Sequence, residues 1–421
     1  MQNKKQLKIA VIGSGISGLS AAYYLSKKNK VDLFEKQDHF GGHSYTVDVE
    51  YDEKLKKKIQ VDVGFIVFNH QNYPNLINFF KENKIEIEKS NMSFSVMIND
   101  KDMEYCGKGL SGFFSNKKNI FNLRFVKMFF EIIKFYNESS KLIDLTQDIT
   151  LGDYLKKKKL SDFFINYHLI PMVSAIWSMP PYNASRMPMK FFLKFFQNHG
   201  LFKIKNRPQW YTVANRSKTY VKTVLSKISG EHFKNYKINK IERFNKNLKI
   251  FYGGKNEYFD YEKVVIATHA DDALSLISEP TPGEKNILSN FQYKENLAFL
   301  HFDENVMPKN KKNWCSWNAS VTDDGSKKSS VTYWLNLLQN LKIDKNIFLT
   351  LNPIVEINNN KIYKKIKFKH PYYNNQALES QKNLHLIQNK NNILFCGSYF
   401  GNGFHEDGIT SSIKMLKYLN D

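Results

Sequence analysis

Cysteine is scarce in this chain of 421 residues: there are three, Cys106, Cys315 and Cys396. Three widely spaced thiols supply neither a disulfide framework nor the paired spacing of a metal site, and they fit a reducing cytoplasm. Long apolar runs are missing as well. No stretch of about 18 uncharged apolar residues occurs, which excludes a transmembrane helix. Since no apolar run precedes Leu7, we expect no signal peptide and a cytoplasmic protein.

Acidic residues are few relative to basic ones: 40 Asp and Glu stand against 62 Lys and Arg, giving a formal net charge of +22. A nucleic-acid partner is not expected, because the chain contains no recognisable nucleic-acid-binding module. Two explanations stay open. The charge can reflect a composition rich in Lys, Asn and Ile, or it can favour peripheral contact with an anionic inner membrane.

The most informative feature that is present lies near the start of the chain. An apolar segment at residues 8–12 breaks into a G-x-G-x-x-G run, enters a helical pattern, and leads to a second apolar segment that ends on Glu35. This spacing predicts a strand–turn–helix–strand unit that binds a dinucleotide pyrophosphate at the helix N-terminus. A carboxylate at position 35 accepts ribose hydroxyls and disfavours NADP. The run consists of Gly13, Ser14, Gly15, Ile16, Ser17 and Gly18.

A second glycine pair follows directly, in the sequence Gly41-Gly42-His43. Taken alone, such a pair is equally typical of an ordinary turn. After a Rossmann fingerprint it resembles the loop by which flavoproteins of the amine oxidase and phytoene desaturase superfamily contact FAD. Those proteins usually carry Arg where His43 stands or nearby. The resemblance implies FAD as the cofactor, with Lys36 and the Gly41–His43 loop beside it.

Later segments extend this resemblance over nearly the whole chain. Residues 263–271 are similar to the "VVIAT" strand that returns to the dinucleotide domain, and residues 392–409 resemble the C-terminal flavin motif. Further segments resemble a bacterial family of FAD/NAD-binding amine-oxidase-like oxidoreductases, often associated with lipid methyltransferases of the cyclopropane-fatty-acid-synthase type. These segments are residues 61–69, 175–178, 198–201, 207–210, 314–318, 333–339, 350–353 and 403–408.

The resemblance implies an α/β fold with two domains. A Rossmann-type FAD-binding domain is expected from residues 1–90, 205–285 and 385–421. A discontinuous α+β substrate domain is expected from residues 91–204 and 286–384. Strand-like alternation at residues 297–302 and 330–334 is consistent with a sheet in that second domain.

Two segments of the expected substrate domain combine phenylalanines with lysines at helical spacing: residues 123–135 and 187–196. Basic helices with a Phe-rich face can lie in the headgroup region of a bilayer. The alternative is that both are core helices.

The resemblance also suggests roles for single residues. His405 is the first candidate for an acid or base, and His301 and Tyr293 are the second; a structural histidine is the alternative for both His405 and His301. A helix that begins near Gly408 would direct its N-terminus at the flavin. Glu406 and Asp407 could hold the turn or the ribityl chain, or simply cap the helix. The remaining expected cofactor contacts are Ile238, Ala267, Thr268, Gly397, Tyr399 and Ile409; no metal site is expected.

Three functions remain open on this basis. The first is an FAD-dependent oxidoreductase that desaturates, dehydrogenates or isomerises an acyl lipid; residues 297–299 lack the Lys that many amine oxidases place opposite the flavin. The second is an amine oxidase. The third is a flavin-binding accessory protein that serves a lipid methyltransferase. With a single dinucleotide fingerprint, the electron acceptor is expected to be oxygen, a quinone or a carrier protein.

Overall fold

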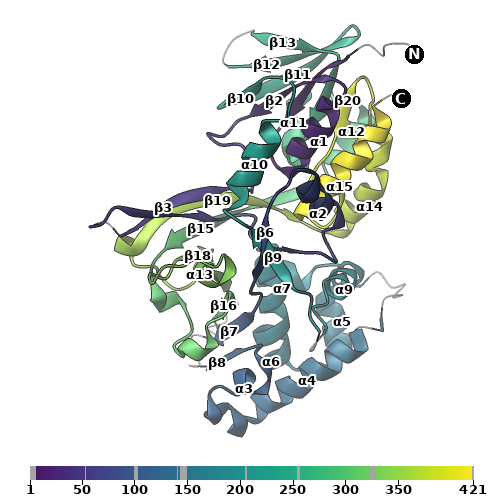
Figure 1. Cartoon of the computed structure of the whole chain (residues 1–421). Coiled ribbons are helices and arrows are strands. Elements are labelled where there is room, and N and C mark those ends of the chain that lie inside the picture. The colour runs from purple at the N-terminus through teal and green to yellow at the C-terminus, as the bar shows by residue number, and fades with distance from the viewer. Residues whose placement is uncertain are drawn as a thin grey trace.

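A computed structural model describes residues 6–52, 54–98, 103–139, 141–142, 149–203, 206–253, 257–322 and 328–419. Two large sheets organise the chain, one parallel and one mixed (Figure 1). None of the described helices is both long and apolar enough to cross a membrane. The α/β fold class expected from the sequence is confirmed.

The parallel sheet has the strand order β10-β2-β1-β14-β20. Its strands are β1 (Lys8–Ile12), β2 (Lys30–Glu35), β10 (His232–Lys234), β14 (Lys263–Ile266) and β20 (Ile393–Phe395). All five come from the three segments expected to form the dinucleotide domain. Successive side chains of a strand point to opposite faces. Ile9 and Val11 therefore pack on one side, while Ala10 and Ile12 pack on the other.

Different elements cover the two faces of this sheet. Helices α1, α2, α10 and α15 cover one face, and helices α11 and α12 with the antiparallel sheet β11-β12-β13 cover the other. The bounds are α1 (Ile16–Ser26), α2 (Pro74–Glu82), α10 (Ser217–Leu225), α11 (Ala270–Leu276), α12 (Pro282–Leu288), α15 (His405–Met415), β11 (Ile238–Phe244), β12 (Asn247–Tyr252) and β13 (Tyr258–Tyr261). Because α1 and α15 pack side by side, their N-termini lie at the same edge of the sheet.

The mixed sheet has the order β19-β15-β18-β17-β16-β7-β8. Its strands are β7 (Phe94–Ile98), β8 (Met103–Cys106), β15 (Gln292–His301), β16 (Trp317–Val321), β17 (Ser329–Trp334), β18 (Phe348–Leu351) and β19 (Ile362–Tyr372). All lie within the segments expected to form the substrate domain. Smaller sheets pair β3 (Thr46–Asp52) with β4 (Lys57–Asp62), and β5 (Phe68–Asn69) and β6 (Ile87–Ser90) with β9 (Trp210–Val213).

A helical layer covers one face of the mixed sheet and forms the end of the molecule remote from the Rossmann sheet (Figure 1). Its helices are α3 (Gly109–Phe113), α4 (Leu123–Ser139), α5 (Leu151–Lys157), α6 (Asp162–Phe164), α7 (Ile170–Trp177), α8 (Pro181–Ser185) and α9 (Met189–Asn198). Two further helices, α13 (Leu335–Leu338) and α14 (Asn375–Asn383), lie elsewhere in the same segments.

Helix α9 corrects one expectation. Phe192 and Phe196 are fully buried and Phe191 and Phe195 nearly so, so the second Phe-rich basic segment is a core helix. Its exposed residues are Lys190, Lys194 and Asn198. A membrane contact through residues 187–196 is therefore wrong.

Candidate functional site

The glycine-rich turn after β1 contains two glycines that the packing requires and one, Gly15, that faces open space. A Cβ on Gly18 would lie 1.8 Å from the Gly13 carbonyl oxygen, and a Cβ on Gly13 would lie 2.9 Å from the Ala267 carbonyl oxygen. These two glycines are needed by the fold itself. Gly15, in contrast, has nothing within 4 Å of an added Cβ. Its backbone therefore faces open space at the first turn of α1, where free N–H groups attract an anion.

Glu35 lies at the end of β2 and faces this turn. Its Oε2 atom accepts hydrogen bonds from the Ser14 backbone N–H (3.0 Å) and hydroxyl (2.6 Å), and its Oε1 atom accepts one from the Gln37 N–H (2.9 Å). A carboxylate has about four acceptor positions, so one remains for a ribose hydroxyl. Glu35 is thus fixed in place and retains acceptor capacity.

The Gly41–Ser44 loop runs beside the same turn. The Gly41 N–H donates to the Ser14 backbone carbonyl and to its hydroxyl, both at 3.1 Å. Gly42 has a φ of +57°, and a Cβ there would lie 3.0 Å from the Gly15 Cα. Only glycine allows this approach. The loop therefore forms the second wall around Gly15.

Helix α15 forms the third wall. A Cβ on Gly408 would lie 2.7 Å from the Ser17 hydroxyl, and Ser20 and Ser412 are hydrogen-bonded across the two helices at 2.7 Å. Ile409 is fully buried in the core between α15 and the sheet. The positive ends of two helix dipoles thus meet at one place, which suits a polyanionic ligand.

The two carboxylates at the start of α15 are already used by the protein. Glu406 accepts hydrogen bonds from the backbone N–H groups of Asn75 (3.0 Å) and Leu76 (3.0 Å), at the start of α2. Asp407 accepts from the Phe404 N–H at 2.9 Å and holds the preceding turn, and burial raises its pKa to about 6. Both act as helix caps, which was the alternative to a contact with the ribityl chain.

His405 is the first residue of α15 and contacts residues from the loops after β2 and β4. Its Nε2 atom is 2.9 Å from the Ser44 hydroxyl, which is in turn hydrogen-bonded to the Tyr220 hydroxyl. Its ring stacks on Phe65 with centroids 3.7 Å apart. Burial lowers the pKa of His405 to about 3, and His43 adds to the effect. His405 is therefore neutral at pH 7 and joins α15 to the Gly41–Ser44 loop, and its role as an acid or base stays a prediction.

His43 has two further histidines around it. Its ring lies 6.1 Å from that of His269 and 5.5 Å from that of His370, and it stacks on Phe368 at 5.3 Å. The His43 Nε2 atom is buried, and no described residue hydrogen-bonds to it. Burial lowers the pKa values of His43 to about 4 and of His269 and His370 to about 3. We call His43, His269, His370 and His405 the histidine group; all four rings are neutral at pH 7.

Local sequence did not predict this group as a whole. His269 follows β14 and His370 lies on β19, where its Nδ1 atom accepts from the Asn296 side-chain amide at 2.8 Å. Only the return of these strands to the loop after β2 brings the rings together. The one signal in the sequence was His269, which directly follows the "VVIAT" segment expected to return to the dinucleotide domain.

The other expected cofactor residues have the following places. Ala267 and Thr268 lie under the glycine-rich turn, where the Ala267 N–H donates to the Ile12 carbonyl at 2.8 Å. The Gly397 N–H donates to the Ser411 hydroxyl at 2.9 Å. Three side chains face away from the turn: Ile238 and Tyr399 are in the core on the far side of the sheet, and Lys36 forms an ion pair with Asp272 at 3.3 Å.

Tyr293 and His301, the second candidates for an acid or base, are both engaged in hydrogen bonds within the fold. The Tyr293 hydroxyl accepts a hydrogen bond from the Ala270 N–H at 3.0 Å, and burial raises its pKa further above the ordinary value. His301 lies eight residues further along β15, roughly 27 Å away at about 3.4 Å per residue. Its Nε2 atom is 2.8 Å from the Thr350 hydroxyl, and its Nδ1 atom accepts from the Asp303 N–H at 3.1 Å. His301 is a structural residue of the mixed sheet.

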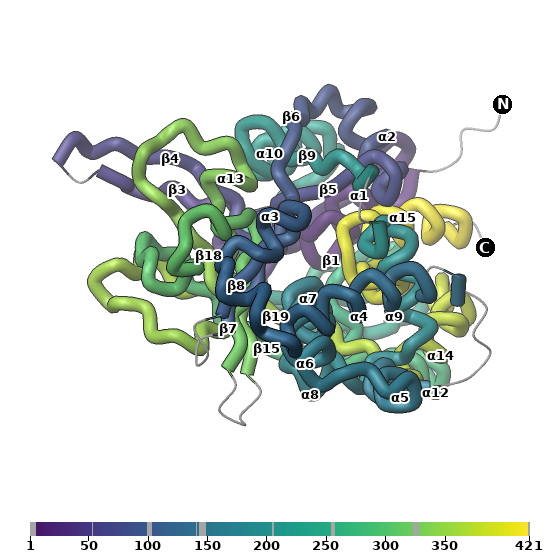
Figure 2. The backbone as a smooth tube through the Cα atoms, turned by 90° about the horizontal axis from the view of Figure 1, so that it is seen from below, coloured from purple at the N-terminus to yellow at the C-terminus, as the bar shows by residue number. Residues whose placement is uncertain are grey.

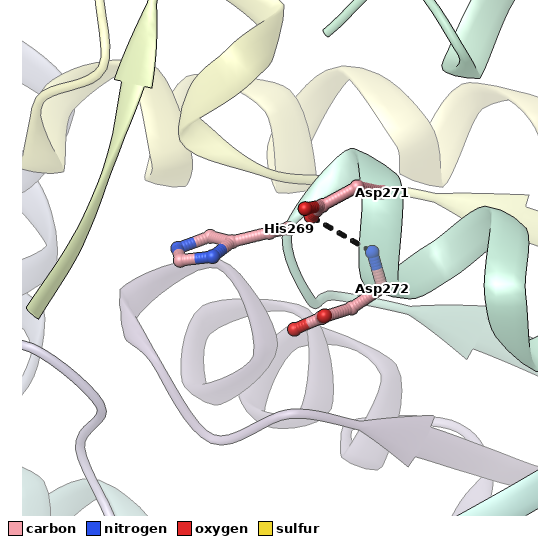
Figure 3. Close-up of side chains that lie close together, drawn as sticks. All are labelled: His269, Asp271 and Asp272. Atoms are coloured by element: carbon pink, nitrogen blue, oxygen red, sulfur yellow. Dashed lines mark hydrogen bonds between the residues drawn. The ribbon is translucent and has the colours of Figure 1, made fainter. Parts of the chain in front are cut away.

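One group of side chains has ligand types that suit a metal ion: His269, Asp271 and Asp272 (Figure 3). Their potential ligand atoms lie within 4.8 Å of one another. However, the Lys369 ammonium is 2.5 Å from Asp271 and 3.4 Å from Asp272, and Lys36 also pairs with Asp272. Because these ammonium groups already neutralise the carboxylates, the cluster is an ion-pair network.

Comparison with known proteins agrees with this architecture. Residues 11–82 match the family of NAD(P)-binding Rossmann-like domains. No curated protein matches the chain. Among solved structures, the chain is similar to a fatty acid isomerase from P. acnes that produces CLA, with 12% identity over 98% of this chain and 99% of the other and a TM-score of 0.68.

Two oxidases are about as similar. Cyclohexylamine oxidase from Brevibacterium oxydans IH-35A has 11% identity over 99% of this chain and 100% of its own, with a TM-score of 0.67. Putrescine oxidase bound to putrescine has 10% identity over 99% and 100%, with a TM-score of 0.65. At these identities the likeness shows a shared fold. It confirms, at the level of the fold, the expected likeness to the amine oxidase superfamily.

Proposed function

We propose that this protein is an FAD-dependent oxidoreductase that acts on a C–C or C=C bond of an acyl lipid. The assignment of FAD rests on the backbone at Gly15, which has open space beside it. Glu35, the Gly41–Ser44 loop and the N-terminus of α15 surround that space. The fold shared with a fatty acid isomerase and with amine oxidases supports the reaction class.

The residues around Gly15 fit a flavin dinucleotide. The first turn of α1 offers backbone N–H groups to a pyrophosphate, and Glu35 has acceptor capacity for a ribose. The unpartnered Nε2 atom of His43 supplies a hydrogen-bond donor or acceptor where related flavoproteins carry a cation. When bound, FAD supplies a two-electron hydride acceptor.

The protein's own contribution begins with orientation. The hydrogen-bonded series His405–Ser44–Tyr220 ties the start of α15 to the loop after β2, so both walls of the site keep one relative position. The α15 dipole stabilises negative charge that develops beside its first turn. Phe65, stacked on His405, keeps water from that side.

The side chains near His405 favour an apolar substrate over an ammonium. Phe404 precedes it and stacks on Phe195 at 5.1 Å, and Phe195 stacks on His199 at 3.9 Å. The carboxylates closest in sequence, Glu406 and Asp407, are bonded to backbone N–H groups. An ammonium group that leaves water pairs best with a free carboxylate, and neither of these two carboxylates is free.

Anaerobic reduction of the flavin tests this proposal. The purified protein should be yellow and release FAD when denatured. The bound flavin should bleach with unsaturated fatty acids or phospholipids and stay oxidised with primary amines and polyamines. Bleaching by amines alone would make it an amine oxidase, the function of two proteins that share its fold. A flavin that no substrate reduces, in a protein that co-purifies with a lipid methyltransferase, would make it an accessory protein.

A further inference from the structure

One end of the molecule exposes large apolar side chains in a short segment. Of the eleven large hydrophobic residues exposed in the described chain, five lie between residues 110 and 130. They lie on α3, on the 3₁₀ turn Lys117–Phe121, and on α4, at the end of the molecule remote from the Rossmann sheet. Figure 1 shows this end at the bottom, and Figure 2 views it from below. The residues are Leu110 (63% exposed), Ile120 (51%), Phe121 (86%), Leu123 (83%) and Phe130 (62%), and we call them the α3–α4 surface.

Helix α4 contributes a regular stripe to this surface. Leu123, Lys127 and Phe130 lie four and three residues apart, so they share one face of the helix. The opposite face is buried, with Phe125 and Met128 fully enclosed. Since the inner face anchors the helix in the aromatic core, the outer residues are held out as a fixed surface.

The charge of this segment has one sign. Between residues 107 and 130 there is no Asp or Glu, whereas the same stretch carries five basic residues. Four of them, Lys117, Lys118, Arg124 and Lys127, are exposed, and none forms an ion pair with any described residue. The fifth, Lys108, donates to the Trp314 carbonyl at 2.9 Å.

We propose that the α3–α4 surface docks on an anionic phospholipid bilayer, with its apolar side chains in the headgroup region and its basic side chains against the lipid phosphates. Aromatic and leucine side chains flanked by Lys and Arg are the chemistry that such an interface binds. The nearest carboxylate on α4, Glu131, already accepts hydrogen bonds from the Ser161 N–H and hydroxyl. A second copy of this chain is a poorer occupant, because two such surfaces would place eight unpaired cations face to face.

The helical layer behind this surface is continuous with the proposed active site. Aromatic contacts run from Phe113 and Phe125, at 4.6 Å, through the core to Phe195 and Phe404 beside His405. Docking by this end would place the substrate domain on the membrane and the Rossmann domain away from it. The proposal itself does not depend on the flavin reaction, since its residues do not contact the Gly15 site.

Co-sedimentation with vesicles tests the proposal. The wild type should bind vesicles of phosphatidylglycerol and phosphatidylcholine at about 50 mM NaCl, bind phosphatidylcholine alone far more weakly, and be released at about 500 mM NaCl. Neutralising Lys117, Lys118, Arg124 and Lys127 to Gln should weaken binding more than about 100-fold, at roughly five-fold per charge. F121Q with L123Q should weaken it about ten-fold or more at the same salt.

A matched control separates this surface from net charge. Lys28, Lys234, Lys237 and Lys246 are exposed on the Rossmann side, and their replacement by Gln changes the net charge equally. It should leave binding within about five-fold of the wild type. FAD content and the thermal midpoint, read on every variant, should stay at wild-type values because all these positions are exposed.

Three results would overturn the proposal. The first is a wild type that does not sediment with anionic vesicles at low salt. The second is an equal loss of binding in the surface variant and in the control variant, each of which replaces four basic residues by Gln; that result would assign binding to overall charge. The third is a wild type whose self-association is abolished by F121Q with L123Q, which would make the surface a contact between copies. Loss of flavin reduction with vesicle binding intact would count against the proposed function alone.

Discussion

Replacing Gly15 by valine should remove FAD binding while leaving the fold intact. Gly15 has φ −62° and ψ 178°, an extended conformation that any residue adopts, and an added Cβ would have nothing within 4 Å. We expect the free energy of unfolding of the apoprotein to change by no more than about 1 kcal/mol, since Gly15 makes no side-chain cap. A branched side chain would occupy the position that a pyrophosphate needs.

The loss of affinity follows from the hydrogen bonds displaced. Bonds from backbone N–H groups to a charged acceptor are worth about 1.5–3 kcal/mol each. Displacing one or two of them should weaken FAD binding about 100-fold or more, at 1.4 kcal/mol per tenfold. Quenching of FAD fluorescence during titration of the apoprotein measures the dissociation constant, and urea unfolding of the same samples measures the stability.

Two glycines provide the comparison. G18A should instead lower the free energy of unfolding by more than about 3 kcal/mol, because its Cβ would lie 1.8 Å from a backbone oxygen. G283V, at the first turn of α12, introduces the same side chain at 3.7 Å from its nearest neighbour and should change neither property. The reasoning fails if G15V binds FAD like the wild type, or if it loses stability as G18A does.

Four further predictions concern the walls of the site, the histidine group and the core. S44A should cost about 2 kcal/mol in urea unfolding and lower FAD retention, because it leaves His405 Nε2 and a buried tyrosine hydroxyl without partners; an unchanged midpoint would show that the series is not formed. E406Q should lower stability by about 1–2 kcal/mol through the cap of α2, and a thermal midpoint equal to that of wild type would refute this role. The histidine group is neutral when folded and takes up protons when unfolded. Stability should therefore fall as pH drops from 6.5 towards 4, by up to about 1.4 kcal/mol per pH unit for each ring, with Asp407 offsetting about one of them. Urea midpoints that do not move between pH 7 and pH 5 would contradict that. F192E should prevent folding, because it buries an unpaired carboxylate in a position with no exposure, whereas F130E on the exposed face of α4 should fold; expression of soluble, folded F192E would count against a core α9.

The Rossmann unit could be predicted because its evidence is local. The segment from Lys8 to Glu35 contains the strand, the turn, the helix and the acidic residue in one continuous stretch, and each has a spacing set by the backbone. The histidine group could not be predicted in this way. His370 reaches His43 only through the pairing of β15 with β19, and no local pattern reports such a distant contact.

The two Phe-rich helices show a second limit. All four phenylalanines of α9 are buried, whereas α4 leaves Leu123 and Phe130 uncovered, although both helices repeat their charges at a spacing of three or four residues. Periodicity reports which face of a helix is apolar, but not whether a neighbouring element covers a second face. The strand pattern of residues 297–302 likewise indicated β15 correctly. It did not show that His301 is the last residue of this strand, remote from Tyr293.

The order in which the chain is synthesised has a consequence for this site. The fingerprint at Gly13–Gly18 is made early, whereas the strand β20 that completes the parallel sheet and the helix α15 that closes the third wall follow only after residues 393 and 405 have been reached. At about 5–20 residues per second, tens of seconds separate the two events. During that interval the edge of β14 is unpaired and the apolar face that α15 covers is open. A nascent chain in which α15 has not yet been made therefore lacks the third wall of the dinucleotide site and exposes this apolar face.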